Sequence, residues 1–257
     1  MLSERQIELF ISDGYVKVEN AFSKELACEC KAVIHDHLDL SNDQSNQWKE
    51  PVIRIPELKD KLFLKAANSP ILTNIYSQLA GNNWYPLTSM GGFPIRFPST
   101  KKPTDTGWHV DASFSKTNKD EFLDWRINIY SEGKALLMLF LFSDTFENDA
   151  PTKIWKGSHQ TVAQILYQFE EEGLTFMDLA NRFDKPSPDK IDFAIGQAGT
   201  VYLCHPFLIH AAQEHKGSSP RFMAQPSLIS KSRFIIDDLV KFLCPIEKAI
   251  INGIYQR

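Results

Sequence analysis

His109 and Asp111 stand one residue apart in the segment Trp108-His109-Val110-Asp111, and both side chains are of types that bind metal ions. In an extended strand, side chains two positions apart point to the same side. The spacing therefore predicts that the imidazole and the carboxylate share one face, while Trp108 and Val110 face the other way. The pair alone is a weak signal, because so short a motif also arises by chance.

Two residues further along the chain, His210 and Arg221, make the pattern more specific. Two histidines and one carboxylate on one face of an octahedron hold Fe(II) and leave three positions open. A 2-oxo acid can take two of these positions through its carboxylate and ketone, and dioxygen can take the third. The far carboxylate of the oxo acid then needs a fixed cation. The planar guanidinium of Arg221 suits this role because it binds carboxylates bidentately.

The elements that must position these residues change character along the chain. Residues 1–90 carry mostly helical signals, which begin with a capping box at Ser3 and Gln6 and continue with apolar residues at helical spacing over 23–38 and 70–79. From Met90 onward, alternating apolar residues punctuated by glycine and proline indicate strands. The apolar run Ala135–Phe142 indicates a buried strand.

Helices followed by many short strands predict a mainly β fold with flanking α-helices, arranged as a jelly roll. We expect one domain over residues 1–257, because barrels and sandwiches of this length commonly form a single unit. Within it, residues 1–90 are expected to be mostly helical support, and 91–230 the jelly-roll core with a helical insertion near 162–192. Residues 231–257 are expected to form a helical tail, with a helix over Pro245–Ile251.

Composition excludes several classes of function. The net charge is -4 and the nearest thing to a basic patch is Lys101-Lys102, so we expect no nucleic-acid binding. No apolar run is long enough to span a bilayer, and the N-terminus opens a polar helix rather than a signal peptide, so we expect no membrane association and a cytoplasmic location. The four cysteines are too scattered for a disulfide framework and are expected to be reduced. Nothing in the sequence indicates an oligomeric state.

The motifs together resemble the phytanoyl-CoA dioxygenase superfamily of Fe(II)/2-oxoglutarate-dependent oxygenases. The similar segments span nearly the whole chain: Leu2–Gln6, Asp13–Val16, Gly107–Asp111, Gly157–His159, Gly199–Ala211 and Pro220-Arg221. The resemblance implies a cupin-like double-stranded β-helix, an Fe(II) cofactor, 2-oxoglutarate as co-substrate and dioxygen as oxidant. It also implies that His109, Asp111 and His210 bind the metal and that Arg221 anchors 2-oxoglutarate.

His205 competes with His210 for the third ligand position, because it shares a strand face with Val201 and Leu203. The resemblance and the spacing to Arg221 favour His210, and we expect His205 to pack or to form a supporting hydrogen bond.

The sequence departs from the family pattern at two places. The family often has Gly-Ser after the distal histidine, where this chain has Ala211-Ala212, so a hydroxyl that could help to hold 2-oxoglutarate is absent. Thr106, three residues before His109, is a candidate to replace it. The loop usually written Pro-Gly-Ser-His begins here with Lys156.

Reaction type and substrate follow less directly. Relatives that halogenate carbon replace the ligand carboxylate with a small residue, so Asp111 predicts a hydroxylase, which would release succinate and CO2. Arg96, Trp125 and Arg126 are candidates to line the mouth of the pocket and hold an anionic small molecule. Alternatively, Arg96 pairs with a structural carboxylate such as Asp105 and Trp125 belongs to the core. No coenzyme A recognition element is evident, so an acyl-CoA substrate is not assumed.

Two other functions are compatible with the same ligands. One is a cupin-type Zn- or Mn-dependent isomerase or hydrolase, and the other is a non-catalytic jelly-roll binding protein. The first gives Arg221 no oxo acid to hold, and the second predicts that loss of His109 changes ligand affinity without abolishing turnover.

Overall fold

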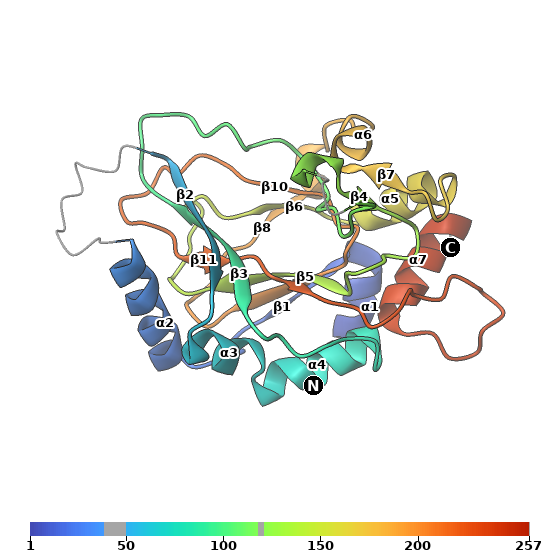
Figure 1. Ribbon diagram of the computed structural model, residues 1–257, viewed down its shortest axis with the longest axis horizontal. Coiled ribbons are helices and arrows are strands. Elements are labelled where there is room, and N and C mark those ends of the chain that lie inside the picture. The colour runs from blue at the N-terminus through green and yellow to red at the C-terminus, as the bar shows by residue number, and fades with distance from the viewer. Residues whose placement is uncertain (39–49, 118–120, 257) are drawn as a thin grey trace.

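Two β-sheets form the centre of the structure, and helices pack on the outer side of the larger sheet (Figure 1). The structure is a computed structural model that describes residues 1–38, 50–117 and 121–256. The larger sheet has the order β1-β9-β5-β11, with β12 also paired to β5. Its strands are β1 (Tyr15–Val18), β5 (Leu136–Leu141), β9 (Val201–Cys204), β11 (Met223–Ala224) and β12 (Ser227–Leu228).

The smaller sheet has the order β10-β6-β8, and two further strand pairs extend the β structure. The smaller sheet consists of β6 (Lys153–Trp155), β8 (Ile191–Phe193) and β10 (His210–Ala211). The two pairs are β2 (Val52–Leu58) with β3 (Met90–Arg96), and β4 (Arg126–Ile127) with β7 (Leu174–Thr175). The predicted fold class, a mainly β jelly roll with flanking helices, is confirmed, although the sheets do not close into a continuous barrel.

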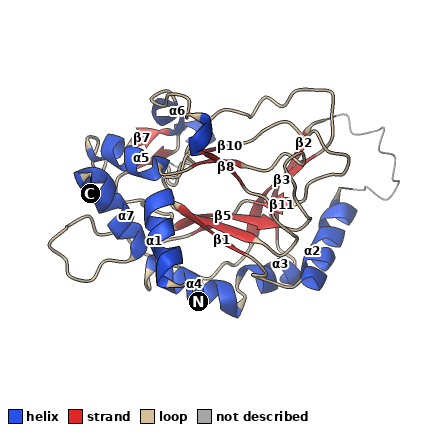
Figure 2. Cartoon of the chain, turned by 180° about the vertical axis from the view of Figure 1, so that it is seen from behind, coloured by secondary structure: helices blue, strands red, loops and turns tan. Residues whose placement is uncertain are grey.

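The helices lie at the periphery, as the view from behind also shows (Figure 2). They are α1 (Glu4–Asp13), α2 (Lys24–His37), α3 (Lys61–Ala67), α4 (Pro70–Ala80), α5 (Ser158–Tyr167), α6 (Phe176–Ala180) and α7 (Pro245–Tyr255), with short 3-10 turns η1 (Phe122–Asp124) and η2 (Pro188–Lys190). No helix in the described part of the chain is long and apolar enough to cross a membrane.

Local sequence signals explain several of these boundaries. Ser3 and Gln6 form the predicted capping box of α1, and Gly14 ends that helix in the left-handed conformation, at φ 87°. Every residue of β5 is buried, as the apolar run predicted. A strand with no exposed face needs apolar side chains on both sides, so β5 forms the centre of the core.

Two segments differ from the sequence-based expectations. The elements β2 and α3 were not predicted. Pro56 stands within β2, which accommodates it as an edge strand whose one partner in the described structure is β3. The helical insertion begins earlier than residue 162, since α5 starts at Ser158, and it includes the short strand β7. The division of the chain into one domain with three segments stays a prediction.

Candidate metal centre

His109 and His210 face each other across a single antiparallel bridge. The backbone N–H of each donates to the carbonyl oxygen of the other, both at 3.0 Å. Residues 108–111 form no regular strand beyond this bridge, which corrects the expectation of a strand there. The expected geometry is nevertheless present, because Asp111 Oδ1 lies 3.5 Å from His109 Nε2 and 3.6 Å from His210 Nε2.

The orientation of both imidazoles is fixed by the backbone. His109 Nδ1 lies 2.9 Å from the carbonyl oxygen of Gly107, and His210 Nδ1 lies 3.1 Å from that of Leu208. An Nδ1–H that donates to a carbonyl leaves the lone pair of Nε2 for a metal. The ligating atoms of the two histidines and Asp111 all lie within 4.8 Å of one another. This donor set therefore fits a divalent metal ion.

A buried lysine, Lys134, supports Asp111 from behind. Its Nζ donates to the backbone carbonyl oxygens of Asp111 and Ala112, both at 3.1 Å, and lies 3.9 Å from Asp111 Oδ2. Burial acts to raise the pKa of Asp111, but the charge of Lys134, with contributions from His210 and His109, holds it well below its usual range. The carboxylate is therefore ionised, as a metal ligand must be.

Gln225 also contacts the cluster. Its Nε2 lies 3.2 Å from Asp111 Oδ2 and 3.1 Å from His210 Nε2. Coordination of a metal by His210 would replace the second of these hydrogen bonds. Sequence reasoning missed both Gln225 and Lys134, although Gln225 could have been found, because it lies four residues after Arg221 on the same strand face.

The cluster lies in a cavity of about 860 Å³, into which side chains of several elements project. Besides the metal cluster, Lys134 and Gln225, the charged, polar and aromatic lining residues include Arg54, Arg96, Asp105, Trp108, Trp125, Thr152, Phe176, Arg221 and Ser227. The volume is within the range of about 300–1,000 Å³ that is usual for small-molecule sites.

Arg221 is fully buried in the wall of this cavity. Its Nη2 donates to the carbonyl oxygen of Pro94 at 3.1 Å, its Nη1 donates to that of Ala150, and its Nε has no partner among the described residues. Burial, together with the nearby charge of Arg96, lowers the pKa of Arg221 to about 9. Among the described residues this buried guanidinium has no ion-pair partner and keeps one unused N–H, which fits an anionic ligand.

The remaining predicted residues are distributed differently. Arg96 lines the cavity and pairs with Asp105 at 2.7 Å, which is the alternative that the sequence left open, and Trp125 lines the cavity as well. Arg126 is not among the lining residues, because its guanidinium donates to the carbonyl oxygens of Glu172 and Gly173 at 2.8 and 2.9 Å. Thr106 is not among them either.

His205 lies outside the cavity and is fully buried elsewhere. Its Nε2 is 3.4 Å from the carbonyl oxygen of Ile246, and its ring packs against His159 with centroids 4.9 Å apart. His210 is therefore the histidine that completes the cluster.

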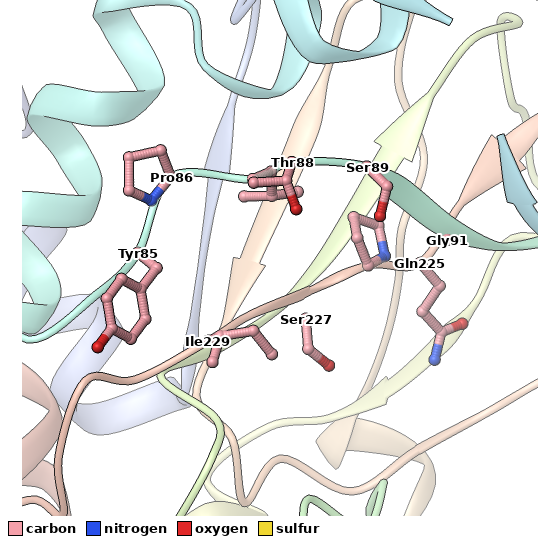
Figure 3. A pocket seen from close by; sticks show the side chains of 10 residues that line it. Tyr85, Pro86, Thr88, Ser89, Gly91, Gln225, Ser227 and Ile229 are labelled. Atoms are coloured by element: carbon pink, nitrogen blue, oxygen red, sulfur yellow. The ribbon is translucent and has the colours of Figure 1, made fainter. Parts of the chain in front are cut away.

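A second groove of about 680 Å³ adjoins the cavity. It runs between residues 85–91 and 225–229, which face each other across it in Figure 3. Gln225 and Ser227 line both the groove and the metal cavity, so this segment forms the partition between them.

Comparison with known proteins identifies the family to which the sequence is similar. The sequence model described as Phytanoyl-CoA dioxygenase matches residues 10–223. No curated protein sequence matches the chain.

Similar solved structures include apo EctD from S. alaskensis, which is 20% identical, with 89% of this chain and 76% of that chain covered and a TM-score of 0.53. The carbocyclase SnoK from nogalamycin biosynthesis is 18% identical over 89% and 84% of the two chains, with a TM-score of 0.57. The epimerase SnoN, solved with Fe3+, alpha-ketoglutarate and nogalamycin RO, is 16% identical over 86% and 81%, with a TM-score of 0.54. At these identities the likeness to the solved structures concerns the fold alone. The match to the family model covers most of the chain, and the protein therefore belongs to the phytanoyl-CoA dioxygenase family.

Proposed function

We propose that this protein is a non-haem Fe(II)- and 2-oxoglutarate-dependent dioxygenase that hydroxylates a small organic molecule. The observation that carries the proposal is the convergence of His109, Asp111 and His210 on one point of a cavity whose wall contains the buried Arg221. Membership of the family supports it, as do neighbours of the same fold that are described as alpha-ketoglutarate-dependent.

The three ligands would hold the iron. Bound there, iron would supply the activation of dioxygen, with 2-oxoglutarate oxidised to succinate and CO2 so that one oxygen atom enters succinate and the other enters the product. Asp111 occupies the position that would otherwise be open to a halide, which favours hydroxylation. The backbone hydrogen bonds of His109 and His210 pre-orient the ligands, so metal binding needs little rearrangement.

Arg221 and Thr152 would hold the far carboxylate of 2-oxoglutarate. Ala211 pairs with Lys153, and Gln213 Nε2 donates to the carbonyl oxygen of Pro151 at 2.6 Å, so Ala212 and Thr152 lie beside each other. Both line the cavity. The hydroxyl of Thr152 donates to the sulfur of Met223 at 3.8 Å, which is a weak acceptor. Thr152, rather than Thr106, therefore replaces the hydroxyl missing at Ala212.

The first test is binding of 2-oxoglutarate to the Fe(II)-loaded protein, followed by succinate formation. We expect the wild type to bind and slowly decarboxylate 2-oxoglutarate, His109→Ala to lose iron, and Arg221→Met to keep iron but to bind 2-oxoglutarate at least about tenfold more weakly. A protein that retains a metal but never binds 2-oxoglutarate would instead support a Zn- or Mn-dependent isomerase or hydrolase.

The role of Thr152 has its own test. Thr152→Val keeps the shape of the side chain and removes the hydroxyl, so the KM for 2-oxoglutarate should rise about tenfold, as expected for loss of one hydrogen bond to a charged group. Ala212→Ser added to this variant should restore most of the affinity. Thr106→Val serves as the control and should leave the KM unchanged. Failure of Ala212→Ser to rescue would show that the two positions do not serve the same carboxylate.

A further inference from the structure

We propose that the substrate is an organic anion with an apolar body, whose carboxylate or phosphate group binds Arg54 and whose body packs against Leu123, Phe176 and Met177. This inference rests on the proposed function and names the substrate class of the same site. It is carried by the charge balance of the cavity, by the placement of Arg54, and by an apolar wall on the described part of the lining.

The cavity holds more positive than negative charge. Four cationic side chains line it, and only two carboxylates do so among the described residues: Arg54, Arg96, Lys134 and Arg221 against Asp105 and Asp111. Iron would add two positive charges and 2-oxoglutarate would supply two negative ones. The surplus therefore remains after both have bound, and an anionic substrate would compensate it.

One of the two surplus charges is located at the cluster of Arg54, Arg96 and Asp105. A single oxygen of Asp105, Oδ2, accepts hydrogen bonds from both arginines. One carboxylate thus serves two guanidinium groups. Lys134 has Asp111 as its counter-ion, and Arg221 is assigned to the co-substrate.

Arg54 is the member of this cluster that a ligand can reach. The side chain of Arg96 is 2% exposed, whereas that of Arg54 is 61% exposed. Arg54 lies opposite Pro94 in the β2–β3 pair, and residues opposite each other in an antiparallel pair point to the same face. Pro94 and Arg96 line the cavity, so the same face carries Arg54 to its mouth.

Another part of the lining is apolar and incompletely buried. Leu123 is 52% exposed and Met177 is 45% exposed, and the ring of Phe176 lies 5.4 Å from the ring of the ligand His109. The backbone N–H of Phe176 donates to the carbonyl oxygen of Trp125 at 2.9 Å, which joins α6 to the segment after η1. Apolar surface held beside a metal ligand gains free energy when an apolar ligand covers it.

The anionic group is tested with matched probes of one chain length. Protein loaded with Fe(II) and 2-oxoglutarate without oxygen is titrated with octanoate, octyl phosphate and octanamide. Binding is followed by tryptophan fluorescence, to which Trp108 and Trp125 in the cavity lining contribute. We expect octanoate or octyl phosphate to bind at least about tenfold more tightly than octanamide. The tighter of the two anions identifies the head group.

Matched variants assign the anion and the apolar body to their proposed sites. Arg54→Gln should remove the preference for the anion, whereas Lys59→Gln, an exposed ion-paired residue just after β2, should keep it. Met177→Glu should weaken octanoate binding about tenfold or more through lost apolar contact and charge repulsion. Leu9→Glu, at a similarly exposed apolar residue of α1, should not weaken it.

If neither octanoate nor octyl phosphate binds more tightly than octanamide, or if the preference survives Arg54→Gln, this inference is overturned. Calorimetric binding of 2-oxoglutarate, measured on the same Fe(II)-loaded protein before any probe is added, separates the two proposals. If 2-oxoglutarate binds and the anion preference is absent, only the substrate class is wrong. If 2-oxoglutarate does not bind, the proposed function itself fails.

Discussion

Asp111 is electrostatically coupled to Lys134 as well as to the two histidines. The lysine side chain is only 4% exposed, and Asp111 is the counter-ion that the described structure gives it. Burial lowers the pKa of Lys134, and the charge of Asp111 opposes that shift. Removing one member of a buried pair leaves the other charge uncompensated, whereas removing both can be nearly neutral.

This coupling predicts a non-additive pair of substitutions in the metal-free protein. Asp111→Asn and Lys134→Met should each lower the free energy of unfolding by about 2 kcal/mol, less than for a fully enclosed pair because Asp111 is 20% exposed. The double variant should recover most of the loss, as measured by urea denaturation. Lys101→Met, which breaks an exposed pair with Glu50, should cost less than about 1 kcal/mol. Additive losses in the double variant would show that the pair is not coupled.

Residues of the site could be predicted from the sequence where one local rule was enough. Alternation in extended backbone placed Asp111 beside His109, and the same rule carried from Arg221 leads to Gln225. Thr152 and Lys134 could not be found in this way. Thr152 reaches the cavity only because β6 pairs with β10 in a particular register, and that register joins segments about 60 residues apart.

At the scale of elements, most of the helices were predictable, whereas α3 and the shortest strands were not. Ser3, Ser23 and Ser69 each accept a backbone N–H in the first turn of α1, α2 and α4, so the sequence marks where those helices begin. Strands of two residues, such as β4 and β7, have no periodicity to read. Their position depends on tertiary contacts, chiefly on the turn that precedes β7.

Gly173 is the residue on which that turn depends. It has a φ of 59°, and a Cβ placed on it would lie 2.1 Å from the carbonyl oxygen of Ile127 in β4. The β4–β7 pair leads directly into α6, which supplies Phe176 and Met177 to the cavity wall. The shape of this wall is therefore linked to the close approach of Gly173 to the backbone of Ile127.

Gly173→Ala should consequently impair substrate binding without touching the metal. The left-handed conformation alone should cost about 1–2 kcal/mol, and the backbone clash adds to it, so β4 and β7 must separate. We expect octanoate to bind at least about tenfold more weakly while iron and 2-oxoglutarate affinities stay unchanged. Gly157→Ala is the control, because Gly157 also has a positive φ, 75°, but its nearest Cβ contact is an ordinary 3.5 Å. Equal effects of the two substitutions on octanoate binding would argue against the proposed link.

At the scale of the whole molecule, two buried histidines join the helical layer to the end of β9. His159 Nε2 lies 3.0 Å from the carbonyl oxygen of Ile11 in α1, and His205 Nε2 lies 3.4 Å from that of Ile246 in α7. His205 Nδ1 accepts the backbone N–H of Phe207 at 3.1 Å, so a proton there would face a donor. Burial lowers the pKa of His159 to about 4, and burial with the charge of His159 lowers that of His205 well below its usual range.

These two pKa values predict that the fold loses stability in mild acid. Both groups bind protons more readily in the unfolded chain, where the pKa of histidine is about 6.5, so their contribution is fully present above that pH and is lost as the pH falls toward about 4. At about pH 5 the low pKa of His159 should lower the free energy of unfolding by about 2 kcal/mol, and His205 acts in the same direction. Urea denaturation of the metal-free protein between about pH 7.5 and 5 measures how the free energy of unfolding changes with pH. His159→Gln should reduce this slope markedly. His37→Gln is the control and should not reduce it, because His37 is an exposed histidine at the end of α2. An unchanged slope in His159→Gln would mean that acid sensitivity originates elsewhere, in which case the contacts of α1 and α7 with the sheet do not depend on a neutral histidine pair.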